Sequence, residues 1–480
     1  MAANPQAQQP AGTEQLAMEH GTHFIVYKRR FFGLVQLALL NIIVSWDWLT
    51  FSAASKTSAQ FFDVSEADIN WLSTGFMFAF LVSCPGVIWV LNRYPPKMAI
   101  VIASVLVLIG NWLRYAGARS GTNGIFGLVV FGQVIIGFAQ PFVLASPTRY
   151  SDAWFSSAGR VSATAVASLA NPLGGALGQL IGPLWATSPS KVPSMVLYTA
   201  IIASVASVPS FFLPALPPTP PSPSTSLRES QPLTAELRAL VRNKQFWLLM
   251  LPFSVFVAAF NATSSLLNQI FEPYGFSEDQ AGIAGAVLIF VGLGVSAIVS
   301  PIIDRTKAYL LTLKMLIPLI SVCYLVLVFI AQTRSFAAVC VIMALIGGAS
   351  FALLPCALEY LVEITWPVSP EASSVTAWAG GQLIGSLFVI IMTALKGPFT
   401  SHPTHDQPQD TMIRALVLQA VFCLAVLPAG MFIGVGVRTD LQRNRLTKET
   451  TASTTPSMGP AAELHFARRF PCRLFSPKRL

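Results

Sequence analysis

An aspartate lies between two tryptophans at residues 45–48 (SWDW), inside an apolar run that begins at Phe31. A charged side chain in such a run is costly unless it faces a partner or a water-filled cavity, so Asp47 is a candidate site residue. Trp46 and Trp48 are two positions apart and would project about 200° from one another on a helix. They cannot both face one cavity, and position alone leaves ligand contact and anchoring at the membrane interface as equal alternatives.

The other polar side chains inside apolar runs are mostly neutral amides, which can orient a ligand by hydrogen bonds without fixing its charge. They are Asn111, Gln133, Gln140, Asn171, Gln179, Asn261, Asn268, Gln269, Gln382 and Gln419, together with Glu359. All five histidines lie outside these runs. A histidine relay inside the membrane, or haem held there by histidine, therefore has no residue to work with.

Enzymatic chemistry is not indicated, because the sequence contains no Walker motif, no HExxH and no GxSxG. We therefore expect no catalytic residues and no enzyme activity. The six cysteines form no CxxC pair, so we expect neither a metal site nor a cofactor. Without a nucleotide-binding domain, a secondary carrier is favoured over a primary pump.

Two acidic residues one helical turn apart, Glu359 and Glu363, lie near the end of a later apolar run. Residues four positions apart share one face of a helix. We expect these two to pair with basic loop residues such as Arg149 and to hold an inward-facing gate. Structural pairing is favoured over proton coupling.

The composition places these residues in a membrane protein, because 54% of the 480 residues are hydrophobic and only 11% are charged. A soluble domain of this length would carry about 25% charged residues. The net charge of +9 is spread over short connections, and no DNA- or RNA-binding module is recognisable, so no nucleic-acid partner is expected. The lipid bilayer is the expected surrounding, in the plasma membrane or in the membrane of an internal organelle.

A bilayer core requires about 20 predominantly apolar residues per helix. The sequence predicts twelve such helices, at residues 31–55, 71–91, 98–117, 124–147, 160–185, 194–216, 246–271, 281–303, 309–331, 336–361, 372–396 and 412–437. The expected fold class is therefore an all-α membrane protein with twelve transmembrane helices.

The chain is predicted to divide into two halves of six helices. Its expected parts are a polar N-tail (1–30), a first six-helix bundle (31–216), a Pro/Ser-rich linker (217–245), a second bundle (246–437) and a basic C-tail (438–480). The pentapeptide GQLIG recurs six spans apart, at 178–182 and 381–385, as a parallel repeat predicts. Lysine and arginine gather on the side of the N-terminus, whereas the opposite loops are partly acidic, so both termini are expected in the cytoplasm.

Several polar motifs resemble those of one transporter family. They are INWLS (69–73), GQVIIGFAQPFVLASPTR (132–149), SSLLNQ (264–269), DRTK (304–307), LEYLVEITWP (358–367) and GGQLIG (380–385). The chain resembles the feline leukaemia virus subgroup C receptor-related transporters, solute carrier family 49, within the major facilitator superfamily. The resemblance implies a major facilitator fold and transport of choline or ethanolamine, with haem as an earlier proposal for the family.

The resemblance also implies a substrate site. Trp48 corresponds to the first-span tryptophan that faces a quaternary ammonium, and Gln140 and Gln382 correspond to the glutamines of the fourth and eleventh spans. Asn261 replaces a tyrosine that completes an aromatic cage, and Asp47 stands where relatives often carry a neutral amide. Because of these two departures, a primary amine or another hydrogen-bonding cation competes with choline as the expected substrate.

A short acidic-basic turn is similar to the one that pins helix pairs in major facilitator transporters. It contains Asp304 and Arg305, and its counterpart between the second and third spans has Asn92 in place of the usual aspartate. The resemblance therefore implies conformational roles for Asp304 and Arg305 and a weaker latch in the first half.

The preferred hypothesis is a monomeric alternating-access carrier of a small organic cation or amine. One alternative is a carrier of haem, a porphyrin or another amphipathic metabolite. A second alternative is a receptor or sensor in the membrane that does not transport its ligand.

Overall fold

The computed structural model describes residues 27–155, 157–219, 233–306, 308–365, 368–397 and 411–434. All helices of the described ranges belong to one compact unit, which ends at Ile433. The predicted C-tail at 438–480 and most of the predicted N-tail lie outside the described residues. Every regular element in the described ranges is a helix, which confirms the predicted all-α class.

The first group of helices runs to the linker. It comprises α2 (Arg30–Leu49), α3 (Ser55–Phe62), α4 (Glu66–Arg93), α5 (Pro96–Arg119), α6 (Phe126–Trp154), α7 (Ser157–Trp185) and α8 (Val192–Ser207), with short 3-10 turns at Pro189–Lys191 and Val208–Phe212. The predicted first span, 31–55, is wrong at its end, because α2 stops at Leu49 and α3 is a separate short helix. Apolar and small residues fill the connecting turn, so hydropathy does not reveal this break.

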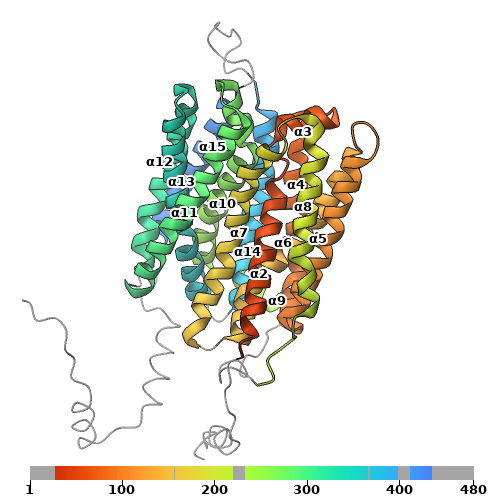
Figure 1. Ribbon diagram of the computed structural model, residues 1–480. Helices are drawn as coiled ribbons and strands as arrows, with labels where there is room; N and C mark the ends of the chain where they lie inside the picture. Colours follow the sequence, from red (N-terminus) through yellow and green to blue (C-terminus); the bar gives the residue numbers. More distant parts are fainter. Residues whose placement is uncertain are drawn as a thin grey trace, which may run out of the picture. The chain divides into compact units, whose positions relative to one another are not determined.

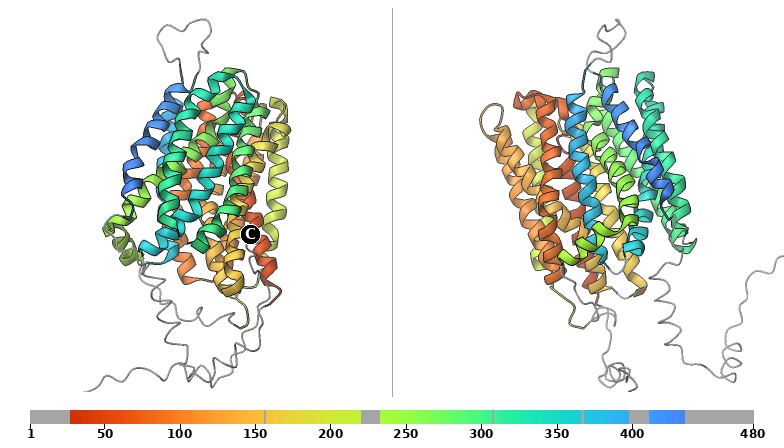
Figure 2. Two further views of the ribbon diagram at one scale, coloured as in Figure 1. Left: turned by 90° about the vertical axis from the view of Figure 1, so that its left-hand side faces the viewer. Right: turned by 180° about the vertical axis from the view of Figure 1, so that it is seen from behind.

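The second group follows the linker. It comprises α9 (Leu233–Arg242), α10 (Lys244–Phe271), α11 (Glu278–Thr306), α12 (Tyr309–Ile330), α13 (Phe336–Thr365), α14 (Pro370–Ala394), α15 (Ile413–Ala425) and α16 (Leu427–Phe432), with 3-10 turns at Glu272–Tyr274 and Ala331–Thr333. Figures 1 and 2 show the long helices of both groups running side by side, with α3 and α9 at opposite ends in Figure 1.

Eleven helical segments of the described chain are long and apolar enough to cross a membrane. The chain is therefore a multi-pass integral membrane protein. The helix α7 is 29 residues long but is not one of the eleven, so the predicted number of twelve spans is not reached by this criterion.

The helices of the two groups pack in the same order. In the first group α2 packs on α7, α4 on α6, and α5 on α6 and α8. In the second group α10 packs on α14, α11 on α13, and α12 on α13 and α15. The two groups meet where α4 packs on α14 and where α7 packs on α11.

Close helix contacts depend on small residues. A Cβ added to Gly174 of α7 would lie only 1.9 Å from the carbonyl oxygen of Ile42 in α2. Membrane helices associate mainly through such close van der Waals contact, since lipid is as apolar as the side chains themselves. Gly174 therefore allows α7 to lie directly against the helix that carries the SWDW stretch.

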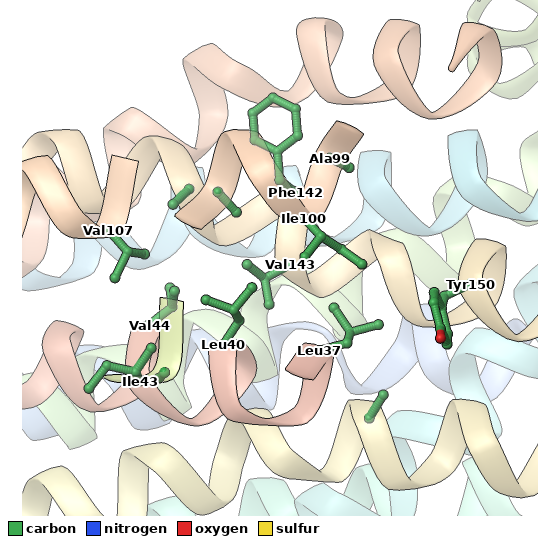
Figure 3. Packing of buried hydrophobic residues seen from close by; sticks show 14 of the residues in the cluster. Leu37, Leu40, Ile43, Val44, Ala99, Ile100, Val107, Phe142, Val143 and Tyr150 are labelled. Carbon is green, nitrogen blue, oxygen red and sulfur yellow. The ribbon is translucent and has the colours of Figure 1, made fainter. Parts of the chain in front are cut away.

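A continuous apolar core surrounds α2. Figure 3 shows side chains of α2, α5 and α6 meeting in one cluster, which includes Leu37, Leu40, Ile43, Val44, Ala99, Ile100, Val107, Phe142, Val143 and Tyr150. Trp48 and Phe76 belong to the same cluster. The core thus holds α2 along most of its length against α4, α5 and α6.

Candidate functional site

The two tryptophans of SWDW contact different helices. The Trp48 ring stacks on Phe76 of α4, with ring centroids 6.4 Å apart and an interplanar angle of 19°. Trp46 stacks instead on Trp185 of α7, with centroids 5.7 Å apart. The Trp48 side chain is only 7% exposed, and its buried indole N–H has no hydrogen-bond partner. Trp48 therefore offers an unused donor inside the protein.

Asp47 forms an ion pair with Arg114 of α5. The Arg114 Nη1 lies 3.1 Å from Asp47 Oδ1, and both side chains are fully buried. The Asn111 amide of α5 donates to the other carboxylate oxygen at 2.6 Å. Both oxygens of Asp47 therefore face α5, where a positive charge balances them.

Arg114 is a residue that the sequence analysis missed. It lies five residues before the next arginine, near the end of the third predicted span, where averaged hydropathy hides a single charge. Two features could have indicated it: the opposite charge of Asp47 in another apolar run, and Asn111 one turn away on the same helix. The partnership itself joins residues 67 positions apart, and the local sequence does not specify it.

The amides of the second group meet directly. The Asn261 side chain of α10 donates to the Gln382 carbonyl oxygen of α14 at 3.1 Å, and both side chains are buried. A Cβ on Gly385 would lie 3.2 Å from Asn261 Nδ2 and 3.3 Å from Met77 Sδ. Met77 follows Phe76 in α4, so the Asn261–Gln382 pair lies beside the helix on which Trp48 stacks.

One further contact joins this region, and Gln140 lies on α6, which packs on α4. Phe260, the residue before Asn261, packs against the cluster that contains Trp48. Gln140 of α6 is 5% exposed, and its buried Oε1 has no hydrogen-bond partner. Trp48 and Gln140 thus provide one unpaired donor and one unpaired acceptor among helices α2, α4, α6, α10 and α14.

The predicted gate residues lie near the C-terminal ends of three helices. Glu359 is exposed and Glu363 is buried on α13, and Arg149 is partly exposed on α6. Arg305 is exposed at the end of α11, and the Asp304 side chain lies outside the described residues. The end of α13 adjoins the second group's first helices, since the Asn243 amide donates to the Ile364 carbonyl at 2.8 Å.

The opposite end carries a polar contact between the two groups that we did not predict. The Glu278 carboxylate of α11 accepts from the backbone N–H groups of Lys56 and Thr57 at 3.0 and 3.2 Å, and from the Thr57 hydroxyl at 2.6 Å. The Asn268 amide of α10 donates to the same carboxylate at 3.0 Å. Because the first N–H groups of a helix are unsatisfied and carry positive potential, Glu278 caps α3 from the other half of the chain.

Ion pairs and amides extend this contact. Lys56 pairs with Glu272, and the hydrogen bond between them raises the pKa of the Lys56 ammonium above its usual value. Lys396 pairs with Glu66 at 2.7 Å. In addition, the Gln269 amide donates to Asn70 at 2.9 Å. These contacts join the two helix groups at the α3 end.

A metal centre is not indicated in the described ranges, where no three His, Cys, Asp or Glu side chains gather in a group that could hold an ion. The polar groups are amides, one indole and balanced ion pairs. Such an arrangement can bind a small polar or cationic molecule, and its placement between helix groups suits a molecule that crosses the membrane.

Comparisons with known proteins cover most of the chain. A family model described as Major Facilitator Superfamily matches residues 37–393. The solute carrier family 49 member A3 of Danio rerio is 31% identical over 452 residues, covering 93% of this chain and 95% of that protein. The protein of the same name in Xenopus tropicalis is 33% identical over 441 residues, covering 87% of this chain and 90% of its own length.

A more distant relative has a named substrate. The choline/ethanolamine transporter flvcr2a of Danio rerio is 25% identical over 466 residues, which cover 94% of this chain and 95% of that transporter. Among solved structures, a D-xylose-proton symporter gives a TM-score of 0.63 at 15% identity and covers 85% of this chain and 98% of its own. This structural likeness confirms the major facilitator type of fold.

Proposed function

Because the chain belongs to solute carrier family 49 of the major facilitator superfamily, we propose that this membrane transporter carries a small organic cation or amine such as choline or ethanolamine. The resemblance seen in the sequence motifs is thereby confirmed at the level of the family. The name of the Danio rerio choline/ethanolamine transporter supports the substrate class.

The buried Trp48 is the observation that carries the proposal. An organic cation over the face of a tryptophan gains about 2 kcal/mol or more when the pair is shielded from water. Trp48 is buried beside α4, and the neutral amides of Gln140, Asn261 and Gln382 occur on helices of both groups. In the proposed site the Trp48 ring contacts the cation, and the three amides orient its polar end. Asp47, the residue before Trp48, tunes the affinity for the cation.

The proposed architecture has twelve spans in two six-helix bundles, 31–216 and 246–437, joined by the linker at 217–245. Helix α7 would be the fifth span, since 29 residues at about 1.5 Å each exceed the roughly 30 Å of a bilayer core. Both termini would lie in the cytoplasm, as the distribution of Lys and Arg suggests. The transporter would work as a monomer.

The proposed mechanism is alternating access. The contacts of Glu278 and Lys56 keep the α3 end closed, and their release would open the site toward that side. At the other end, Glu359, Glu363, Arg149 and the Asp304–Arg305 turn would form the inward-facing gate. A cation would be exchanged at one end while the other end stays shut.

Uptake of labelled choline and ethanolamine into proteoliposomes tests this function. We expect uptake above protein-free vesicles, with a KM that Trp48→Ala raises roughly tenfold or more through loss of the aromatic face. Trp46→Ala is the matched control, because Trp46 stacks on Trp185 and should leave the KM unchanged.

The same assay separates the alternatives. If the wild type moves neither solute, the cation assignment is wrong, and uptake of haem in its place would favour the amphipathic-metabolite carrier. A protein that binds choline without moving it would be a receptor or sensor.

A further inference from the structure

Arg114 contacts the end of α2 at two points one helical turn apart. Its guanidinium forms the ion pair with Asp47 at 3.1 Å and lies 5.0 Å from the centre of the Phe51 ring. These two residues lie on either side of Leu49, where α2 ends. The Arg114 side chain of α5 thus contacts one residue before and one residue after the C-terminal end of α2.

The backbone of Asp47 is held as well. Its carbonyl oxygen accepts from Arg114 Nη1 at 3.4 Å and from the Gln133 amide of α6 at 3.0 Å. Carbonyl groups in the last turn of a helix lack partners within the helix and must be satisfied by other groups. Two neighbouring helices therefore fix the last turn of α2 through the same residue.

Arg114 itself has little room to move. A Cβ on Gly132 of α6 would lie 2.9 Å from the Arg114 backbone nitrogen, so α5 and α6 are in close backbone contact there. The guanidinium is fully buried, and its charge is balanced by Asp47. A long cationic side chain held in this way can act as a rigid spacer between α5 and α2.

Trp48 is the residue that this anchoring orients. It follows Asp47 directly, and about 100° of helical rotation turns its side chain from the α5 side toward Phe76 of α4. A rotation of the last turn of α2 would displace the Trp48 ring from α4. We propose that Arg114, with Asp47 and Gln133, is a positioning residue that fixes the direction of the Trp48 ring in the substrate site, an inference that rests on the proposed function.

This role also explains how a carboxylate can lie next to a cation site without binding the cation. Asp47 Oδ1 faces Arg114 and Oδ2 accepts from Asn111. The pair is neutral as a unit, so the substrate is recognised by the aromatic face and the neutral amides. The contribution of Asp47 to substrate affinity passes through Trp48.

The test is a cycle of transport measurements on the full-length protein in proteoliposomes. Single changes leave one buried charge unbalanced, so the central variant is Asp47→Asn/Arg114→Gln, which removes both charges together. We expect its KM for choline to rise about tenfold while the maximal rate per reconstituted molecule changes little. In a Trp48→Leu background the same double change should raise the KM no further, because both act on one contact.

Two other variants keep the test decisive if the double variant does not fold. Gln133→Leu removes one donor to the Asp47 carbonyl and leaves the ion pair in place, and we expect a smaller rise in KM. Arg114→Lys keeps the charge but loses the planar fork, so its KM should lie between those of the wild type and the double variant. Gln36→Leu is the matched control, since Gln36 anchors the other end of α2 through Ser210 at 2.6 Å and should leave the KM unchanged.

The inference is overturned if Asp47→Asn/Arg114→Gln or Gln133→Leu transports choline with the wild-type KM. It is also overturned if Asp47→Asn/Arg114→Gln raises the KM for choline by the same factor in the Trp48→Leu background as in the wild type. A wild type that moves neither choline nor ethanolamine contradicts the proposed function itself, and the inference then falls with its premise.

Discussion

Asn261 gives the proposed site a polar wall on α10. Its amide is buried and bonded to Gln382, at the position where the family resemblance implies an aromatic tyrosine. An aromatic wall favours a trimethylammonium group through cation–π attraction, whereas an amide favours a group that can donate hydrogen bonds. The choice between choline and ethanolamine should therefore depend on this residue.

We predict that Asn261→Tyr shifts selectivity toward choline. The added ring should lower the KM for choline relative to that for ethanolamine by about tenfold or more, because the cation–π contact would be shielded from water. Competition between the two labelled solutes during uptake measures this ratio directly. Asn261→Leu is the control because it also removes the amide but adds no aromatic face; an equal ratio in the two variants would contradict the aromatic explanation.

The short helix α3 depends on a cap from the other half of the chain. Ala54, which precedes it, makes no side-chain hydrogen bond to the helix, and Glu278 accepts from Lys56 and Thr57 instead. Eight residues are too few for a helix to be stable on its own in water. The helix is therefore expected to be stable only while the two halves meet at this end.

Removal of the cap should destabilise this closed arrangement. We predict that Glu278→Ala lowers the melting temperature of the purified protein, since loss of a carboxylate that accepts several hydrogen bonds costs about 1.5 to 3 kcal/mol. Glu278→Gln retains an acceptor oxygen and should have a smaller effect. Asp279→Ala, at the exposed neighbouring position, should leave the melting temperature unchanged; an equal loss in Asp279→Ala would show that the cap is unimportant.

Sequence reasoning was most reliable for whole helices. The predicted span at 246–271 corresponds to α10, Lys244–Phe271, and that at 160–185 corresponds to α7, Ser157–Trp185. A long apolar run must form a helix in lipid because its backbone groups have no other partners. By contrast, the last turn before Leu49 contacts Arg114 and Gln133, which come from distant parts of the chain.

The site was less predictable than the fold for the same reason. Apolar context indicated that Asp47 was special, but the charge that balances it is on another helix. Likewise, the pairing of Asn261 with Gln382 joins residues 121 positions apart, and no periodicity in the sequence reports it. The identity of a polar membrane residue is visible in a single sequence, whereas its partner emerges only when the helices are assembled.

At the scale of the whole molecule, polar contacts join the two helix groups at the α3 end. The Asn268 amide of α10 donates to the Ser55 hydroxyl at 3.1 Å, beside the Glu278 cap. If transport requires this end to open, a covalent link between the groups must stop it. Ser55 and Asn268 are suitable positions because one precedes the α3 contacts and the other lies on α10.

We predict that a short bis-maleimide, which reacts with one cysteine thiol at each end, abolishes uptake by the Ser55→Cys/Asn268→Cys variant in proportion to the cross-linked fraction. The unlinked variant should retain activity, and the wild type treated with the same reagent controls for its own cysteines. Thr187→Cys/Lys191→Cys is the matched pair, since these exposed residues are bonded within one group at 2.8 Å and their link should leave uptake intact. Undiminished uptake by fully cross-linked Ser55→Cys/Asn268→Cys would mean that substrate passes without separation of the two groups at the α3 end, which would contradict alternating access.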